Sequence, residues 1–208
     1  MFAPTPHDVW DKYLDLYGAE AVFPVADTEL GRLACCASEE ILYPEICRAH
    51  VLRGAEVILH PTSETASNDL TPKDLCKRAR AVENLVYVVS ANSGGVIDSP
   101  ILENSVDGMS KVIDFHGRVL TSASVGESMI AFAELDIGAL RRYRNRPGMS
   151  NTLSRQRLEL FKDTFNNNQV YPANTLLDSN GEHQVPDRSH FVNTQRQSIQ
   201  DLVKRGLI

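Results

Sequence analysis

Two adjacent cysteines stand between an apolar segment and an acidic one in the sequence GRLACCASEE, which begins at Gly31. This pattern predicts a short buried strand that ends on Cys35 and turns directly into a helix. The amino end of a helix carries a partial positive charge, which favours the thiolate form of a nearby cysteine. A thiolate at such a turn is well placed to act as a nucleophile. The first hypothesis is therefore covalent catalysis by cysteine.

The chain has four cysteines, which are Cys35, Cys36, Cys47 and Cys76. They form no C-x-x-C pair and have no companion cluster of histidines, so we expect no metal site. Reduced thiols in a cytoplasmic protein are the simplest interpretation. Cys47 and Cys76 fall in expected helices and are interpreted as small core residues. A redox thiol in an unrelated α/β protein is an alternative for Cys35, opposed by the poor disulfide geometry of adjacent cysteines.

The overall composition argues against several classes of protein. The chain has 208 residues and a net charge of -6, which disfavours nucleic acid or an anionic membrane as its main partner. No apolar run approaches the roughly 18 residues needed to cross a bilayer, and the first residues lack the features of a secretory signal. We therefore expect a cytoplasmic protein with one well-buried domain and room for an additional arm.

Apolar residues alternate between strand and helix patterns through the first half of the chain. The expected strands cover residues 30–34, 56–60 and 85–91, and the expected helices cover residues 39–52 and 71–84. Residues 85–91 form a nearly continuous apolar run, which is typical of a strand in a sheet covered on both faces. A further apolar run over residues 20–27 suits a strand interrupted by Pro24. This alternation predicts an α/β fold.

Beyond Asn92 the pattern changes to that of hairpins. Strands are expected over residues 109–115, 119–124 and 129–135, and a helix over residues 154–165. The remainder, residues 166–208, is polar and is expected to form an extended arm with a short helix near residues 197–204. Four arginines, at positions 141, 142, 144 and 146, are interpreted as a solvated face or subunit contact, with carboxylate or phosphate binding as the alternative.

Taken in order, these residues resemble the nitrilase superfamily, the carbon–nitrogen hydrolases. In the nucleophile motif of that family, a glycine and three mostly apolar residues precede the catalytic cysteine, and a Pro-Glu pair follows. The matching residues here are Gly31, Leu33, Ala34, Cys35, Tyr43, Pro44 and Glu45. Further matches follow at Arg48 and at residues 54–56, 79–84, 91–95, 108–110, 114, 117–120 and 135–137. The similarity covers about residues 5–165, and its four-residue step from Gly31 selects Cys35 rather than Cys36.

The resemblance implies a four-layer α-β-β-α sandwich, with a carbon–nitrogen hydrolase domain over residues 1–165 and a C-terminal arm over residues 166–208. It implies hydrolysis of a small amide, nitrile or carbamoyl compound through a cysteine thioester, with no cofactor. It also implies a homo-oligomer, because members of the family form dimers or larger assemblies.

The family pairs its cysteine with an upstream glutamate base, an upstream lysine and a second glutamate. Asp8 is the candidate for the second carboxylate, with Asp11 next, and an ordinary loop acid is the alternative for either. The candidate substrate contacts are Cys36, Thr62, Ser63, Glu64 and Asn92. The last four follow expected strands, where sheet crevices bind ligands, and turn or capping roles are their alternative. For Cys36 the alternative is packing on the opposite side of the strand.

The sequence departs from the family pattern in two further ways. The interval from Cys35 to Pro44 is longer than in the common motif, and Ala37 stands where an acidic residue is usual two places after the nucleophile. The upstream glutamate and lysine have no counterparts, because Lys12 lies in the segment that matches the second carboxylate. We therefore expect an N-terminally incomplete domain with impaired catalysis. The alternative function is a non-catalytic binding or assembly subunit with the same fold.

Overall fold

A computed structural model describes residues 5–64, 71–98, 100, 108–124 and 128–208. The chain divides into two compact units. The helical unit combines the residues up to Val22 with Arg157–Ile208, and the sheet unit is Phe23–Gln156. This division differs from the predicted boundary at residue 165, because residues 157–165 and the N-terminal segment group with the arm. Cys35 belongs to the sheet unit and Asp8 to the helical unit.

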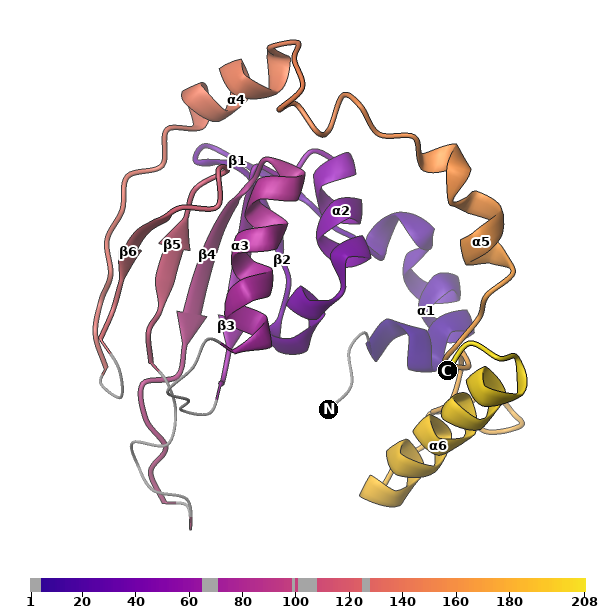
Figure 1. The fold of residues 1–208 in the computed structure, drawn as a ribbon. Coiled ribbons are helices and arrows are strands. Elements are labelled where there is room, and N and C mark those ends of the chain that lie inside the picture. The colour runs from indigo at the N-terminus through magenta and orange to yellow at the C-terminus, as the bar shows by residue number, and fades with distance from the viewer. Residues whose placement is uncertain (1–4, 65–70, 99, 101–107, 125–127) are drawn as a thin grey trace. The chain divides into compact units, whose positions relative to one another are not determined.

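Within the residues described, the sheet unit is built on six strands that lie in chain order, β1-β2-β3-β4-β5-β6 (Figure 1). They are β1 Ala26–Thr28, β2 Gly31–Cys35, β3 Val57–Thr62, β4 Tyr87–Asn92, β5 Lys111–Ile113 and β6 Val119–Ser122. β2, β3 and β4 are parallel, and the remaining neighbours pair antiparallel. Parallel neighbours need a crossover connection, and helices supply both crossovers, so the predicted α/β class is confirmed.

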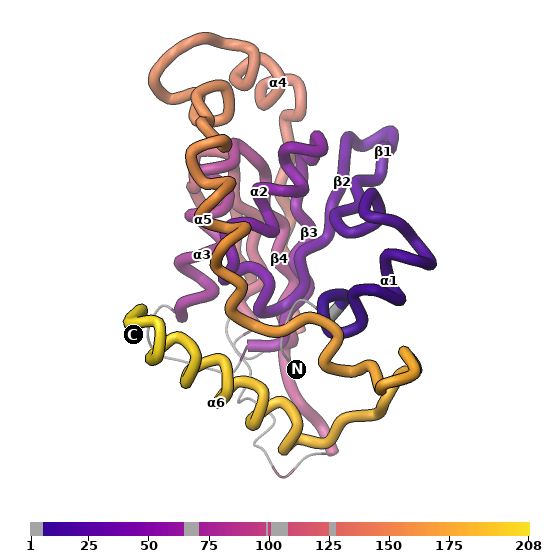
Figure 2. Tube along the Cα trace, turned by 90° about the vertical axis from the view of Figure 1, so that its right-hand side faces the viewer, coloured from indigo at the N-terminus to yellow at the C-terminus, as the bar shows by residue number. Residues whose placement is uncertain are grey.

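Two helices cover one face of this sheet. α2 (Pro44–Leu52) joins β2 to β3, and α3 (Pro72–Asn84) joins β3 to β4. Figure 1 shows both helices in front of the strands, and in Figure 2 they lie on the same side of β3 and β4. Buried side chains fill the space between helices and sheet, among them Ala34, Cys36, Ile46, Ile58, Ala81 and Val88. Apolar burial of this kind is the main source of stability for the layer.

The starts of these helices follow from local sequence. The helix expected over residues 39–52 is two elements, a 3-10 helix η3 (Ser38–Leu42) and α2. The break falls at Pro44, because proline has no amide hydrogen and suits the first position of a helix. α3 begins as predicted, since the Thr71 hydroxyl accepts a hydrogen bond from the Asp74 amide at 3.1 Å.

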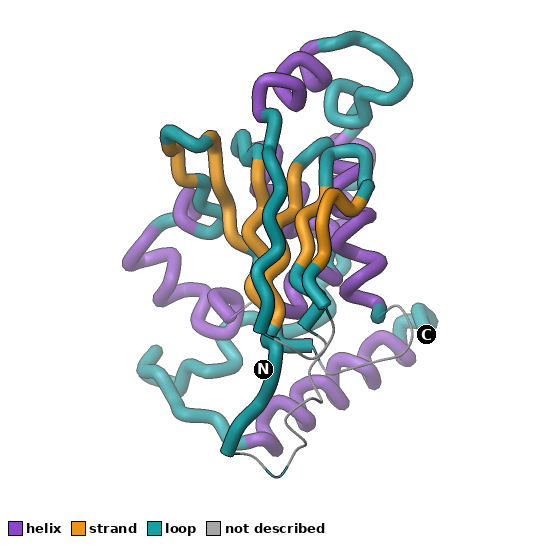
Figure 3. Tube along the Cα trace, turned by 90° about the vertical axis from the view of Figure 1, so that its left-hand side faces the viewer, coloured by secondary structure: helices purple, strands orange, loops and turns teal. Residues whose placement is uncertain are grey.

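The opposite face of the sheet carries a second apolar cluster of Val57, Tyr87, Phe115 and Leu140. The loop that leads into α4 (Ile137–Asn145) runs along this face (Figure 3). The prediction of a strand over residues 129–135 is wrong, because the described structure has no strand pairing there. Ile130 and Phe132 follow a strand-like pattern but are 77% and 81% exposed, so their side chains pack on no partner strand.

The predicted hairpin around Gly117 is confirmed by β5 and β6, which are shorter than expected. The Asp114 carboxylate holds the turn by accepting hydrogen bonds from the amides of His116 and Arg118, both at 2.9 Å. Gly117 has a φ of +77°, and a Cβ there would lie 3.2 Å from the backbone oxygen of Arg78. The turn therefore requires glycine for both its conformation and its close approach to α3.

Two arginines of α4 attach this helix to the sheet. Arg141 donates to both oxygens of Glu56, at 2.7 and 2.9 Å, and Arg144 donates to two backbone carbonyls at 2.8 and 2.9 Å. The Glu56 carboxylate has no exposed surface and also accepts the Arg32 amide at 3.0 Å. Hydrogen bonds from Arg141 outweigh burial and lower the pKa of Glu56 to about 2. Arg141 and Arg144 thus hold the fold together, which the sequence pattern did not indicate.

The helical unit brings together segments from both ends of the chain. Its elements are η1 (Thr5–Val9), α1 (Trp10–Tyr17), η2 (Ala19–Ala21), η5 (Leu158–Leu160), α5 (Lys162–Asn166) and α6 (Arg188–Lys204). The helix expected over residues 154–165 is thus two shorter elements, and the helix expected near residues 197–204 begins earlier, where Asp187 accepts the His190 amide at 2.9 Å. Along the described part of the chain, no helix has the length and apolar character that crossing a bilayer requires.

Candidate active site

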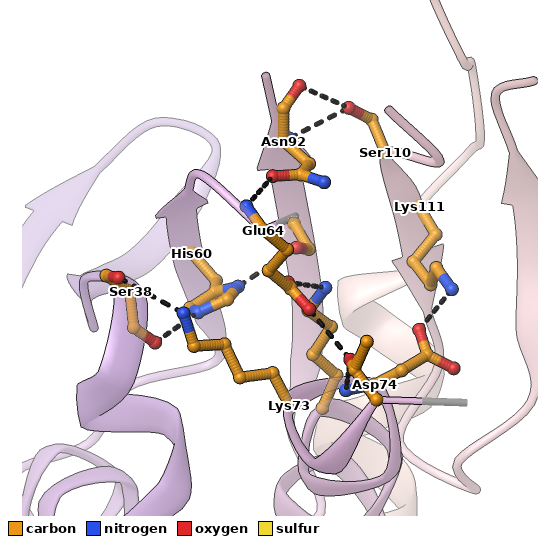
Figure 4. Close-up of polar contacts among 11 residues, drawn as sticks. Ser38, His60, Glu64, Lys73, Asp74, Asn92, Ser110 and Lys111 are labelled. Carbon is orange, nitrogen blue, oxygen red and sulfur yellow. Dashed lines mark hydrogen bonds and ion pairs between the residues drawn. The ribbon is translucent and has the colours of Figure 1, made fainter. Parts of the chain in front are cut away.

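Polar side chains gather where the three parallel strands end. The segments that follow β2 and β3 carry Ser38 and Glu64, and β4 ends on Asn92 at the same edge of the sheet (Figure 4). The first turns of α3 add Lys73 and Lys77 to the same group. Carboxyl ends of parallel strands are the usual place for ligands in sheets of this class. This edge is the candidate active site.

Ser38 is the first residue of η3, where the chain turns after β2, and it has a φ of +48°, a left-handed conformation that is unfavourable for a residue with a side chain. Two contacts hold this turn. The Ala37 amide donates to the Glu40 carboxylate at 2.7 Å, and the Ser38 carbonyl lies 2.9 Å from Nε2 of His60. Strain that is maintained by its surroundings is a recurrent property of functional turns.

His60 is a buried connector between β3, β4 and this turn. Its exposed fraction is 1%, and its Nδ1 lies 2.9 Å from the Ser90 hydroxyl. Because the Ser38 carbonyl can only accept, Nε2 carries the proton and Nδ1 accepts from Ser90. Burial, with the nearby cations Lys77 and Lys73, lowers the pKa of His60. The imidazole is therefore neutral at pH 7 and fixes the position of the Ser38 backbone.

A buried ion pair connects α3 to the end of β3. Lys77 Nζ lies 2.6 Å from Glu64 Oε1, and the two side chains are 3% and 6% exposed. The Thr71 hydroxyl donates to the other carboxylate oxygen at 2.8 Å, and the Glu64 amide donates to Asn92 Oδ1 at 2.8 Å. Burial raises the pKa of Glu64, but Lys77 and Thr71 outweigh it, so the net direction is downward. Glu64 is therefore an ionised carboxylate with its charge matched.

Two further lysines complete the edge. Lys73 Nζ lies 3.3 Å from Ser38 Oγ, one helical turn before Lys77. Lys111 of β5 pairs with Asp74, and the Asn92 amide donates to the Ser110 hydroxyl at 2.9 Å. Figure 4 shows Lys73 extending toward Ser38, while Lys111 extends toward Asp74 in the first turn of α3. The arrangement combines a hydroxyl, a half-buried amine and a matched buried charge pair.

Cys35 is the last residue of β2, as predicted, but its environment differs from the prediction. Its neighbours Ala34 and Cys36 face the helix layer, so its own exposed side chain faces the other side of the sheet. Burial of part of the thiol, together with the negative charge of Glu40, raises its pKa. The expected thiolate stabilisation is therefore wrong, since no described side chain supplies a cation or hydrogen bond to the sulfur. Its role as nucleophile stays a prediction.

Cys36 lies in the core rather than at the site. It has no exposed surface, and its sulfur lies 3.8 Å from that of Cys47. The contact with Cys47 and burial raise the pKa of Cys36, so the thiol is neutral. The proposed substrate contact at Cys36 is corrected to its alternative, packing between sheet and helix.

The other predicted residues divide into three groups. Glu64 and Asn92 meet at the candidate site through the hydrogen bond described above. Thr62 has a buried hydroxyl without a partner among the described residues, and Ser63 is exposed. Asp8 is 5% exposed in the helical unit, where it accepts the Thr175 hydroxyl at 2.7 Å and so attaches η1 to the C-terminal segment. Its catalytic role stays a prediction.

The described residues contain no group of three His, Cys, Asp or Glu side chains that could hold a metal ion. Comparison with known families then gives a specific match. The model of the carbon–nitrogen hydrolase family matches residues 3–145, which is more than half of the chain. The chain belongs to the carbon–nitrogen hydrolase family.

Several relatives of this member of the carbon–nitrogen hydrolase family are known. The nitrilase and fragile histidine triad fusion protein NitFhit of Caenorhabditis elegans is 31% identical over 144 residues, which are 69% of this chain and 31% of that protein. Omega-amidase NIT2 of Mus musculus is 26% identical over 126 residues, 59% of this chain and 43% of that protein. The chain thus spans less than half the length of these relatives.

One solved structure is informative about chemistry in the family. It is a mutant of the amidase from Nesterenkonia sp. AN1, with the acetamide moiety of fluoroacetamide added covalently at the active site cysteine. The likeness has a TM-score of 0.53 at 25% identity and covers 68% of this chain and 47% of that one. The predicted membership of the nitrilase superfamily is confirmed by these matches.

Sequence reasoning missed Ser38, Lys73 and Lys77 of this family member. One signal was present, because the family usually has an acidic residue two places after its nucleophile. Two places after Cys35 stands Ala37, whereas two places after Ser38 stands Glu40. The two lysines gave no signal, because charged residues in the first turns of an amphipathic helix are ordinary.

Proposed function

We propose that the protein hydrolyses a small, non-peptide amide through a covalent acyl intermediate formed at the turn between β2 and η3. Family membership supports hydrolysis of a carbon–nitrogen bond. The amide class is supported by the relatives, which include an omega-amidase and an amidase that is modified by a fluoroacetamide at its active site. The observation that carries the proposal is the convergence of Ser38, Lys73 and the Lys77–Glu64 pair at the carboxyl ends of the parallel strands.

The chemistry of the proposed reaction suits this edge of the sheet. Attack on an amide carbon places negative charge on the carbonyl oxygen, and preorganised cations lower the free energy of that state. The leaving nitrogen must then gain a proton from a nearby group. Lys73 and Lys77 provide positive charge at the edge, and the Lys77–Glu64 pair keeps one of these charges fixed and buried.

Two side chains could carry the acyl group. In the form predicted from sequence, Cys35 attacks and a thioester results. In the second form, Ser38 attacks and an ester results.

The test is ammonia release from a panel of small amides, nitriles and N-carbamoyl compounds, with mass spectrometry of the intact protein after acid quenching. Release from an amide, together with an acyl adduct in the peptide that contains residues 31–45, would support the proposal. Fluoroacetamide serves as a trapping probe. A folded protein that releases no ammonia and gains no adduct would contradict the proposal and favour the non-catalytic binding subunit.

A further inference from the structure

We propose that Cys36 and Cys47 form a disulfide site, which holds either two thiols or a cross-link according to the thiol–disulfide balance in which the protein folds. The proposal goes beyond amide hydrolysis and does not depend on it. It is carried by the contact between the two sulfurs, by the fixed positions of the two backbones and by the burial of the pair. The reactant that it requires is a low-molecular-weight disulfide.

The two sulfur atoms face each other in the reduced protein. Sγ of Cys47 lies 3.8 Å from Sγ of Cys36, and both residues are free thiols. A disulfide needs the same two atoms at about 2.05 Å, and rotation about the two Cα–Cβ bonds is the motion that shortens such a distance. The side chains thus already point toward each other, as a cross-link between them requires.

Hydrogen bonds fix the backbone on both sides of the pair. Cys36 follows β2, and its amide donates to the carbonyl of Leu59 in β3 at 2.9 Å. Cys47 lies in α2, and the next residue, Arg48, donates from Nη2 to the Glu83 carbonyl of α3 at 2.9 Å. The folded protein therefore keeps the two thiols together, whereas the unfolded chain brings them together only at the entropy cost of closing a loop.

Burial controls how fast the pair can react. Neither cysteine has exposed surface, and both belong to the apolar cluster between the sheet and its helices. The contact with Cys47, together with burial, raises the pKa of Cys36 and so disfavours the reactive thiolate. Exchange in the folded protein therefore starts only when this part of the core opens. The pair is set during folding and then retained.

The other two cysteines differ from this pair in their positions. Cys35 faces the other side of the sheet, and a disulfide between the adjacent residues Cys35 and Cys36 has poor geometry. Cys76 of α3 is half-buried, and its sulfur lies 3.7 Å from Nη2 of Arg80. The structure thus favours one pairing among the four cysteines.

The exchange balances with one oxidised glutathione for each cross-link. The Cys47 thiolate attacks one sulfur of oxidised glutathione, the glutathione S–S bond breaks, and one glutathione thiolate leaves. The Cys36 thiolate then attacks the Cys47 sulfur of the mixed disulfide, and the second glutathione leaves. The protein loses two electrons and two protons, and both pass to glutathione.

The cross-link has a defined energetic effect. It encloses residues 37–46, which include all of η3 and connect β2 to α2. Closing a loop of this size in the unfolded chain favours the folded state by about 100-fold, or about 2.8 kcal/mol. By thermodynamic linkage, the same factor separates the oxidation equilibrium of the folded protein from that of the unfolded chain.

The experiment uses the complete chain, refolded from urea by dilution into buffers of reduced and oxidised glutathione. Acid-quenched samples are digested at low pH and mapped by mass spectrometry without reduction, and urea titrations compare the oxidised and reduced forms. Cys36→Ala and Cys47→Ala each remove one partner. Cys76→Ala is the matched control, because it removes another cysteine that packs against the same apolar cluster. Circular dichroism shows whether each variant folds.

We expect a peptide that links Cys36 to Cys47 in wild type and in Cys76→Ala, and an oxidised form whose urea midpoint is higher by about 1.3 M. The equilibrium constant for oxidation by glutathione should be about 100-fold larger in buffer than in urea. Folded Cys36→Ala and Cys47→Ala should have the same midpoint in both buffers.

The wild-type measurements decide the proposal even where an alanine variant does not fold. A different pairing, a folded wild type without the cross-link, or an oxidised form no more stable than the reduced one would overturn it. Ammonia release enters none of these measurements, so the proposed function stands or fails separately.

Discussion

The ion pair between Glu56 and Arg141 gives the sharpest test of how the sheet unit is stabilised. Replacement of Glu56 by Gln keeps the shape of the side chain and removes its charge. The carboxylate has no exposed surface, and it accepts two hydrogen bonds from Arg141 and one from the Arg32 amide. The amide of Gln can satisfy only part of this arrangement, since one of its two terminal groups is a donor. We therefore expect Glu56→Gln to be less stable than wild type.

The pKa of Glu56 gives the size of the expected loss in the free energy of unfolding. It falls from an ordinary value of 4.5 to about 2, and each pH unit corresponds to about 1.4 kcal/mol, so the upper bound is about 3.4 kcal/mol. The side chains of Arg141 and Arg32 are 56% and 44% exposed, and solvent screens their charges. After this discount we expect a loss of about 2 kcal/mol in the free energy of unfolding at pH 7.

The pH dependence has a defined sign. The folded state lowers the pKa of Glu56, so its stabilisation is complete above pH 4.5 and is lost as the pH falls toward 2. The difference between wild type and Glu56→Gln should therefore shrink by more than half between pH 7 and pH 3. At pH 7 it should correspond to a shift of about 1 M in the urea midpoint.

The assay is urea unfolding followed by far-UV circular dichroism at both pH values. Arg142→Gln is the matched control, because Arg142 is the next residue of α4 and is 74% exposed. The control should change the free energy of unfolding by less than about 0.5 kcal/mol. A wild-type midpoint for Glu56→Gln at pH 7, or an unchanged difference at pH 3, would refute the reasoning.

Three further predictions concern the candidate site and its supports. Lys77→Met should lower the free energy of unfolding by about 3–5 kcal/mol because Glu64 is left as a buried, unmatched charge, and the double variant with Glu64→Leu should recover most of the loss in urea titrations. Iodoacetamide should label Cys35 slowly at pH 7 and faster at pH 9, while Cys36 stays unlabelled until the protein unfolds; prompt labelling of Cys36 in the native protein would contradict its burial. Thr71→Ala should lower the free energy of unfolding, measured by thermal unfolding, by about 0.5–2 kcal/mol because the α3 cap is lost. Thr71→Ser should retain most of the stability of wild type.

Local patterns in the sequence predicted the elements that depend on their own residues. The apolar run that becomes β4 and the Thr71-Pro72 start of α3 are examples. The resemblance also identified Gly31, and the structure gives the physical reason. Gly31 has a φ of +117°, and a Cβ there would lie 3.2 Å from Glu56 Oε2.

Features that depend on distant residues were beyond sequence patterns. The conformation of Ser38 is fixed by His60, which is 22 residues away, and its hydroxyl meets Lys73, which is 35 residues away. Residues 129–135 have the composition of a strand but pair with no neighbour in the described structure, because strand formation needs a partner as well as a propensity.

The order of the strands has a consequence for how the sheet unit folds. Each strand lies beside the one that precedes it in the chain, so the sheet can grow by addition of one strand at a time from β1 to β6. The longest connection between neighbouring strands is residues 63–86, between β3 and β4, and the entropy cost of closing a loop grows only slowly with its length. Among the described strands, none has to be inserted between two strands that precede it in the chain. We therefore expect the sheet unit to form faster than parallel sheets of equal size whose strand order requires distant segments to meet.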